Sequence, residues 1–143
     1  MSKVLILFLL WTVCLYAEAF KETRYMYALD ATFTYEGTIT FADDKVLIAY
    51  THPRQEVIEY LKNDADMRKA TFFLILQAIH GENEDLLEQL FMRTQKKEHR
   101  VFLPREPIDD VIREIEVTKD QQGVHVIKIS LQNDDWIRIE TIR

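Results

Sequence analysis

The strongest constraint on the fold of this chain is the apolar run over residues 70–79. Eight of its ten residues are apolar, and on a helix they would point in every direction instead of forming one stripe. A helix on a protein surface needs only a stripe, so this one must be covered on all sides. A run of this length is too short to span a bilayer, which takes roughly 20 residues. It predicts a buried helix, and what covers its second side becomes the main structural question.

The first residues have the pattern of a secretion signal. Lys3 supplies the positive start, and residues 4–13 are apolar except for a single threonine. Ala17 and Ala19 are the small residues that a signal peptidase needs at the positions −3 and −1. We therefore expect a signal peptide over residues 1–19, cleaved after Ala19.

The predicted mature chain is a single domain over residues 20–143, and its composition indicates where it works. Cys14 is the only cysteine and lies within the expected signal, so no disulfide can form in the mature domain. Small secreted eukaryotic domains usually depend on disulfides. The absence of cysteine therefore favours a bacterial periplasm.

Alternating apolar and polar residues predict strands over most of the remaining chain. The clearest case is 34–41, where Tyr35, Ile39 and Phe41 alternate with polar residues. Residues 45–51 are apolar on both faces, so we expect this strand to be covered on both sides. The expected strands are 24–29, 34–41, 45–51, 56–61, 99–103, 111–117, 124–131 and 136–142. Turns are expected at 42–44, 121–123 and 133–135.

Two helices are expected between the two groups of strands. The apolar helix is expected to end at Gly81, which takes the left-handed C′ conformation easily. Asn83 is then placed to cap a second helix, whose apolar stripe is Leu86, Leu87, Leu90 and Phe91. The order of elements predicts an α+β fold, in which a strongly curved antiparallel sheet carries two central helices on its concave side. On periodicity alone, a core that the apolar helix fills completely is the simpler interpretation.

The residues offer little for catalysis or for nucleic acid. The chain has 18 basic and 24 acidic residues, a balance that disfavours a polyanionic partner. Ser130 is the only serine besides Ser2 and stands in an expected strand, without the glycines of a nucleophile elbow. The four histidines show no metal-ligand spacing, and the paired aspartates fall at expected turns. We expect no enzyme activity, no cofactor and no metal site.

Five short motifs, taken in order, resemble the LolA-type periplasmic lipoprotein carriers, in particular the LolA-like branch often encoded beside lipid exporters. They are Phe20-x-Glu22-x-Arg24, Gly37-Thr-Ile-Thr-Phe41, Tyr50-Thr-His-Pro53, Ile79-His-Gly-Glu82 and Val101-Phe-Leu-Pro104. The resemblance implies an incomplete β-barrel with a helical lid over an apolar cavity that shields acyl chains. Two departures are plain: the family's first amphipathic helix is missing, and residues 61–67 are shorter than in relatives.

The resemblance also implies a function, a set of partners and a cavity. It implies a periplasmic carrier or chaperone that binds the acyl chains of lipoproteins or lipids for transport toward the outer membrane. The partners would be the acylated cargo, an inner-membrane exporter and an outer-membrane acceptor, and we expect a monomer. The expected cavity residues are Ile39, Phe41, Val46, Ile48, Tyr50, Phe72, Phe73, Leu76 and Ile79. The alternative is an exported structural or interaction module, or an exporter accessory subunit, with a self-filled core and no lipid cargo.

Overall fold

The computed structural model describes residues 17–80, 84–96, 99–120 and 123–142 of the 143-residue chain. The expected signal peptide lies outside the described residues except for residues 17–19, which begin the first strand. Gly81 and Asn83, the expected helix caps, also lie outside them. No helix in these ranges is both long and apolar enough to cross a membrane.

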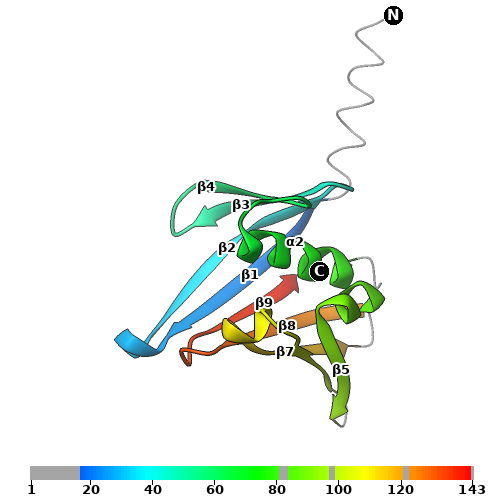
Figure 1. The fold of residues 1–143 in the computed structure, drawn as a ribbon. Helices are drawn as coiled ribbons and strands as arrows, with labels where there is room; N and C mark the ends of the chain where they lie inside the picture. Colours follow the sequence, from blue (N-terminus) through cyan, green and yellow to red (C-terminus); the bar gives the residue numbers. More distant parts are fainter. Residues whose placement is uncertain (1–16, 81–83, 97–98, 121–122, 143) are drawn as a thin grey trace, which may run out of the picture.

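Nine antiparallel strands form one large sheet (Figure 1). They are β1 (Ala17–Met26), β2 (Ala31–Phe41), β3 (Lys45–His52), β4 (Glu56–Leu61), β5 (Phe91–Lys96), β6 (His99–Pro104), β7 (Ile112–Asp120), β8 (Gly123–Leu131) and β9 (Trp136–Ile142). Their order is β4-β3-β2-β1-β9-β8-β7-β6-β5. The first and last strands pair at the centre, while β4 and β5 form the two edges. The sheet is therefore not closed over the described residues.

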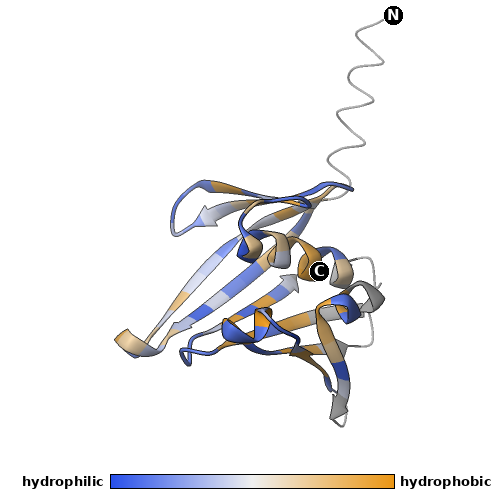
Figure 2. Cartoon of the chain, viewed as in Figure 1, coloured by the Kyte–Doolittle hydropathy of each residue, from blue (hydrophilic) through white to orange (hydrophobic). Residues whose placement is uncertain are grey.

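The strands form where apolar and polar residues alternate, which Figure 2 shows as changing colour bands along β1 and β2. Ile39 lies opposite Ile48, and Phe41 opposite Val46, so these apolar side chains share one face as expected. We call this face, which lies against the helix, the inner face. The outer face of β3 is less covered than its composition suggested, because Leu47 there is only half-buried.

One α-helix is present in the described part of the chain, α2 (Met67–His80). It begins after Asp66, whose side chain accepts a hydrogen bond from the backbone N–H of Arg68 at 2.9 Å, a typical N-cap contact. Three short 3₁₀ helices complete the elements: η1 (Tyr27–Leu29), η2 (Glu84–Gln89) and η3 (Ile108–Asp110). The sheet bends around α2, which contacts β3, β4 and η2 (Figure 1).

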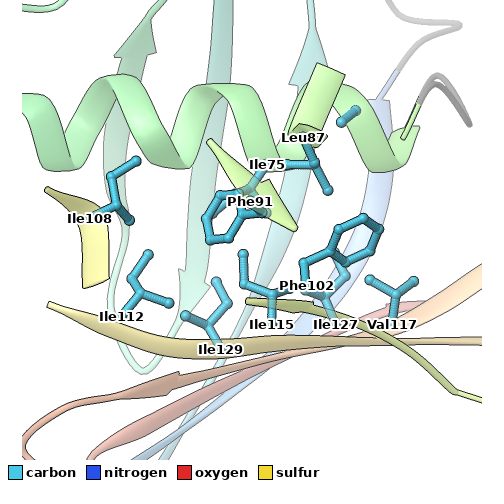
Figure 3. Close-up of a cluster of buried hydrophobic side chains, with 11 residues drawn as sticks. Ile75, Leu87, Phe91, Phe102, Ile108, Ile112, Ile115, Val117, Ile127 and Ile129 are labelled. Atoms are coloured by element: carbon cyan, nitrogen blue, oxygen red, sulfur yellow. The ribbon is translucent and has the colours of Figure 1, made fainter. Parts of the chain in front are cut away.

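Two clusters of buried side chains lie on different sides of α2. The first cluster joins the α2 residues Ile75 and Ala78 to η2, η3 and strands β5 to β8, with Phe102, Ile115 and Ile129 fully buried (Figure 3). The second cluster joins the α2 residues Phe73 and Leu76 to strands β1, β2, β3 and β9. These two clusters explain why α2 is apolar all round, since its own sheet covers both sides.

The expected α+β fold, an incomplete barrel with two central helices as a lid, is wrong. Over the described residues the fold is mostly one large unclosed sheet with a single α-helix. The expected second helix is the short η2 followed by β5, because Phe91 enters a strand and pairs with Pro104. Leu87 and Phe91 are fully buried in the first cluster. Their spacing suits a helix, but strand pairing and burial decide the conformation.

Candidate functional site

An apolar pocket of about 180 Å³ lies between the N-terminal half of α2 and the β7–β9 part of the sheet. Its lining comes from α2, from the segment around η3, and from β7, β8 and β9: Met67, Arg68, Thr71, Phe72, Pro107, Ile108, Val111, Ile112, Leu131 and Ile137. Ile108 and Ile112 lie at one end of the first cluster (Figure 3), so the pocket continues that cluster toward solvent.

The pocket has little capacity for hydrogen bonding. Thr71 is buried, and its hydroxyl donates to the backbone carbonyl of Met67 at 2.7 Å. A threonine hydroxyl has one proton to donate, so its donor is already used within the helix. Arg68 is exposed and supplies the only charged side chain of the lining. Apart from that, the lining suits a hydrocarbon group.

A wider groove of about 530 Å³ lies beside the pocket, along another side of α2. Four residues line both spaces: Met67, Thr71, Pro107 and Ile108. The rest of the groove combines apolar side chains such as Phe73 and Leu74 with polar ones such as Lys62 and Gln77. Pocket and groove thus adjoin near the start of α2, and an elongated amphipathic molecule can occupy both.

A polar cluster occupies the inner face of β1, β2 and β3. The Glu22 carboxylate, 5% exposed, accepts a hydrogen bond from Arg24 Nε at 2.6 Å. It also accepts one from the Tyr50 hydroxyl at 3.2 Å. The Arg24 guanidinium lies over the Tyr35 ring, 4.6 Å from its centroid, an arrangement that adds a cation–π attraction. These four residues hold a buried carboxylate in place.

Titration of this cluster follows from its burial and its charges. Burial raises the pKa of Tyr50, and the negative charge of Glu22 raises it further. Burial alone would lower the pKa of Arg24, but Glu22 and Tyr50 outweigh it and raise that pKa. Burial, and then Glu22, also raise the pKa of Tyr60. At neutral pH Tyr50 and Tyr60 are therefore protonated and Arg24 is charged.

A polar pocket of about 250 Å³ borders this cluster, lined by Arg24, Tyr35, Tyr50, Pro53, Arg54, Glu56 and Ile58. Its charges are paired within the protein, Arg24 with Glu22 and the exposed Arg54 with Glu56 at 3.9 Å. The Arg54–Glu56 pair is exposed and contributes little to stability, whereas the pair of Arg24 and the buried Glu22 joins the strands.

The outer face of the sheet has its own polar group around His99. The Nδ1 atom of His99 lies 3.3 Å from Glu116 Oε1 and 3.0 Å from Thr118 Oγ1. Lys128 Nζ lies 5.1 Å above the ring centroid of Trp136. Cross-strand pairs of this kind are typical of a solvated sheet face. Among the described residues, no group of three or more His, Cys, Asp or Glu side chains could hold a metal ion.

Most of the sequence-predicted cavity residues lie together, but in packed core. Six of them, Ile39, Val46, Ile48, Tyr50, Phe73 and Leu76, are buried in the second cluster, and Phe41 packs against it partly buried. Phe72 lines the apolar pocket, Phe73 lines the groove from the second cluster, and Tyr50 lines the polar pocket. Ile79 lies in α2, and its side chain is outside the described residues.

Sequence reasoning missed most residues of the apolar pocket. Ile108, Val111 and Ile112 follow one another at helical spacing, i, i+3 and i+4, a pattern that marks a short apolar face. Leu131 and Ile137 alternate with polar neighbours on their strands, as inner-face residues do. These local patterns indicate apolar faces at 108–112, 131 and 137, whereas the family resemblance implies a cavity formed by residues 39–50 and 72–79.

Comparison with known proteins gives no relative: no protein-family model matches the chain, and no curated protein matches it.

Proposed function

We propose that this protein is a carrier that binds an acyl chain of a lipid or lipoprotein in the bacterial periplasm. The observation that carries the proposal is the apolar pocket of about 180 Å³ beside α2, adjoining a groove of about 530 Å³. Burial of hydrocarbon supplies the affinity, at roughly 0.8 kcal/mol for each CH₂ group removed from water. No catalytic group is required for such a role.

The volumes set the size of the cargo. An apolar cavity of about 150 Å³ is large enough for a benzene-sized molecule, so the pocket takes only the end of an acyl chain. The remainder of the chain lies in the groove, with its headgroup toward Lys62 and Gln77. We propose a single acyl chain as the cargo, because a multiply acylated anchor needs more apolar space than the pocket offers.

Location and partners are proposed on the sequence pattern. The residues before Phe20 have the features of a cleaved signal peptide, and the order of motifs resembles the LolA-type carriers. An inner-membrane donor and an outer-membrane acceptor are the partners that such a carrier needs.

A second candidate function is supported by the packing of α2. Both sides of the helix are covered by the sheet itself, with Phe73, Ile75 and Leu76 buried in the two clusters. A fold that fills its own core needs no ligand. An exported interaction module with no lipid cargo is therefore the alternative.

Binding of palmitic acid to the purified protein tests the proposal. We expect wild-type protein to bind palmitic acid in calorimetry and to carry added lipid mass in native mass spectrometry after purification from periplasm. Val111 lines the pocket and is 36% exposed, so Val111→Trp can fill the pocket at little cost to folding. We expect this variant to bind palmitic acid about tenfold more weakly, a loss of about 1.4 kcal/mol.

The matched control is Val57→Trp, which adds the same ring to an exposed residue of β4 that lines neither the pocket nor the groove. We expect its palmitic acid affinity to equal that of wild type. If wild type does not bind, the carrier role is wrong and the interaction module is favoured. If Val111→Trp binds palmitic acid as tightly as wild type does, the acyl chain binds elsewhere and this pocket is not its site.

A further inference from the structure

The hairpin of β1 and β2 ends in a tip of exposed apolar side chains. Met26, Tyr27, Leu29 and Phe33 lie at this tip, and Tyr27 and Leu29 are 61% and 62% exposed. In Figure 2 the ribbon at the tip has the orange of hydrophobic residues, while the colours alternate along the rest of the hairpin. Residues 25–35 contain one charged side chain, Asp30. Exposed apolar groups gathered at one place are typical of a surface that contacts a membrane or a partner.

The tip projects beyond the rest of the sheet. Pairing of β1 with β9 ends at Tyr25 and Trp136, and pairing of β2 with β3 begins only at Glu36. On the other side β1 stays paired with β9 as far as Tyr25, so only the Met26–Ala31 pair and the turn between them lie beyond the neighbouring strands. The tip is therefore the short end of the hairpin, beside the β8–β9 turn (Figure 1).

The tip is held in a defined shape. Asp30 has a left-handed φ of 43°, and its backbone N–H donates to the Tyr27 carbonyl at 3.1 Å. Its carboxylate accepts a hydrogen bond from the Tyr25 hydroxyl at 2.9 Å. The Tyr27 N–H donates to the Asp135 side chain at 2.8 Å. The carboxylates of Asp30 and Asp135 thus accept hydrogen bonds from Tyr25 and Tyr27. The apolar side chains of the tip are exposed to solvent.

The apolar pocket lies near the tip, on the other side of the β8–β9 turn. Asp135, which holds the tip, belongs to the β8–β9 turn, whose flanking residues Leu131 and Ile137 line the pocket. Met67 and Val111 also line the pocket and are exposed. Of the nine large apolar side chains exposed among the described residues, six therefore belong to the tip or to the pocket lining.

We infer that this end of the molecule contacts a lipid bilayer, and that Met26, Tyr27, Leu29 and Phe33 enter its interfacial region. The inference rests on the proposed function. A carrier takes its acyl chain out of a membrane, so its binding pocket must come close to that membrane. The four exposed apolar side chains of the tip are far fewer than the roughly 20–30 residues on each side of a standard protein interface. A bilayer requires no complementary surface, and tyrosine side chains are favoured at its boundary with water.

The composition of the tip also predicts which membranes it prefers. The segment has no lysine or arginine, so its attraction to lipid comes from apolar burial and not from charge. Binding should therefore occur on vesicles of neutral phosphatidylcholine and should depend little on salt, unlike binding by a basic patch.

Co-flotation with phosphatidylcholine vesicles tests the inference on the full chain produced in a bacterial host. We expect Leu29→Ser to bind these vesicles about tenfold more weakly than wild type, since one buried leucine is lost from the interface. Val57→Ser, a substitution of an exposed apolar residue away from the tip, is expected to bind as wild type does. Both variants should retain the palmitic acid affinity of wild type in vesicle-free solution.

Tryptophan quenching gives a second readout that does not depend on affinity. Leu29→Trp and Val57→Trp share the native tryptophans, so any difference between them comes from the new ring. We expect brominated phosphatidylcholine to quench the fluorescence of Leu29→Trp more than that of Val57→Trp. Equal flotation of Leu29→Ser and wild type, or equal quenching, would overturn the inference. If the protein binds vesicles through the tip but does not bind palmitic acid, the membrane contact is supported and the carrier role is wrong.

Discussion

The Tyr50 hydroxyl on β3 reaches across β2 and donates a hydrogen bond, at 3.2 Å, to the buried carboxylate of Glu22 on β1. Arg24 completes the arrangement, donating to Glu22 from Nε and to the Tyr50 oxygen from a terminal nitrogen at 3.1 Å. A charge at this depth is costly unless it is paired and hydrogen-bonded. The three side chains therefore tie β1 to β3 across the intervening strand β2.

Glu22→Gln should lower stability more than Tyr50→Phe. The amide has almost the shape of the carboxylate, but it leaves the half-buried Arg24 without its negative partner. We expect a loss of about 1.5–3 kcal/mol in the free energy of unfolding for Glu22→Gln, and about 0.5–1.5 kcal/mol for Tyr50→Phe. Urea unfolding measures both. Wild-type stability in Glu22→Gln would contradict the importance of the ion pair.

Stability should also fall at alkaline pH because of Tyr50. Burial, and then Glu22, raise the pKa of Tyr50 in the folded protein, while an unfolded tyrosine titrates at about 10. Above that pH the unfolded chain binds fewer protons than the folded one, so the free energy of unfolding decreases as pH rises. The contribution is fully present below about pH 10. We expect a shallower decline in Tyr50→Phe, and an unchanged slope would contradict this assignment.

Gly37 is required by close approach of two strands. It lies opposite Tyr50, next to an irregularity in the register of β2 and β3. A Cβ added there would overlap the carbonyl oxygen of Ala49 and lie 2.9 Å from Tyr50 Cα. These are backbone atoms that cannot turn aside, so we expect Gly37→Ala to cost about 1–3 kcal/mol. The exposed neighbour Glu36 is the control, because Glu36→Ala should stay within about 0.5 kcal/mol in thermal or urea unfolding.

Much of the strand structure could be predicted from alternation. The expected strands at 56–61 and 136–142 coincide with β4 and β9, and the turn at 42–44 joins β2 to β3. The buried helix was also predicted, since a helix that is apolar on all sides must be covered on all sides. Such features are local and depend on residues a few positions apart.

What covers the helix could not be predicted, because it depends on pairing over long distances in sequence. Strand β5 exists because Met92 pairs with Leu103 and Phe91 with Pro104, whereas its own first residues also suit a helix. The apolar pocket joins residues as distant as Met67 and Ile137. These residues come together because β1 and β9 pair at the centre of the sheet, and no local sequence pattern predicts that pairing.

The neighbouring residues Phe72 and Phe73 should separate core packing from ligand binding. Phe73 is 5% exposed in the second cluster, so Phe73→Ala should lower the free energy of unfolding by about 3–5 kcal/mol. Phe72 is half-buried and lines the apolar pocket. We expect Phe72→Ala to cost less stability, because its ring packs only partly against the first cluster.

Phe72→Ala should instead change which acyl chains the pocket accepts. Removal of the ring widens the pocket, so a methyl-branched fatty acid should gain affinity relative to palmitic acid. Phe73→Ala should change this ratio less than Phe72→Ala does, because Phe73 lines the groove and not the pocket that takes the end of the chain. Competition against a fluorescent fatty acid, combined with thermal unfolding, measures both effects in the two variants. An unchanged ratio in Phe72→Ala would mean that the acyl chain does not enter beside α2 at this position.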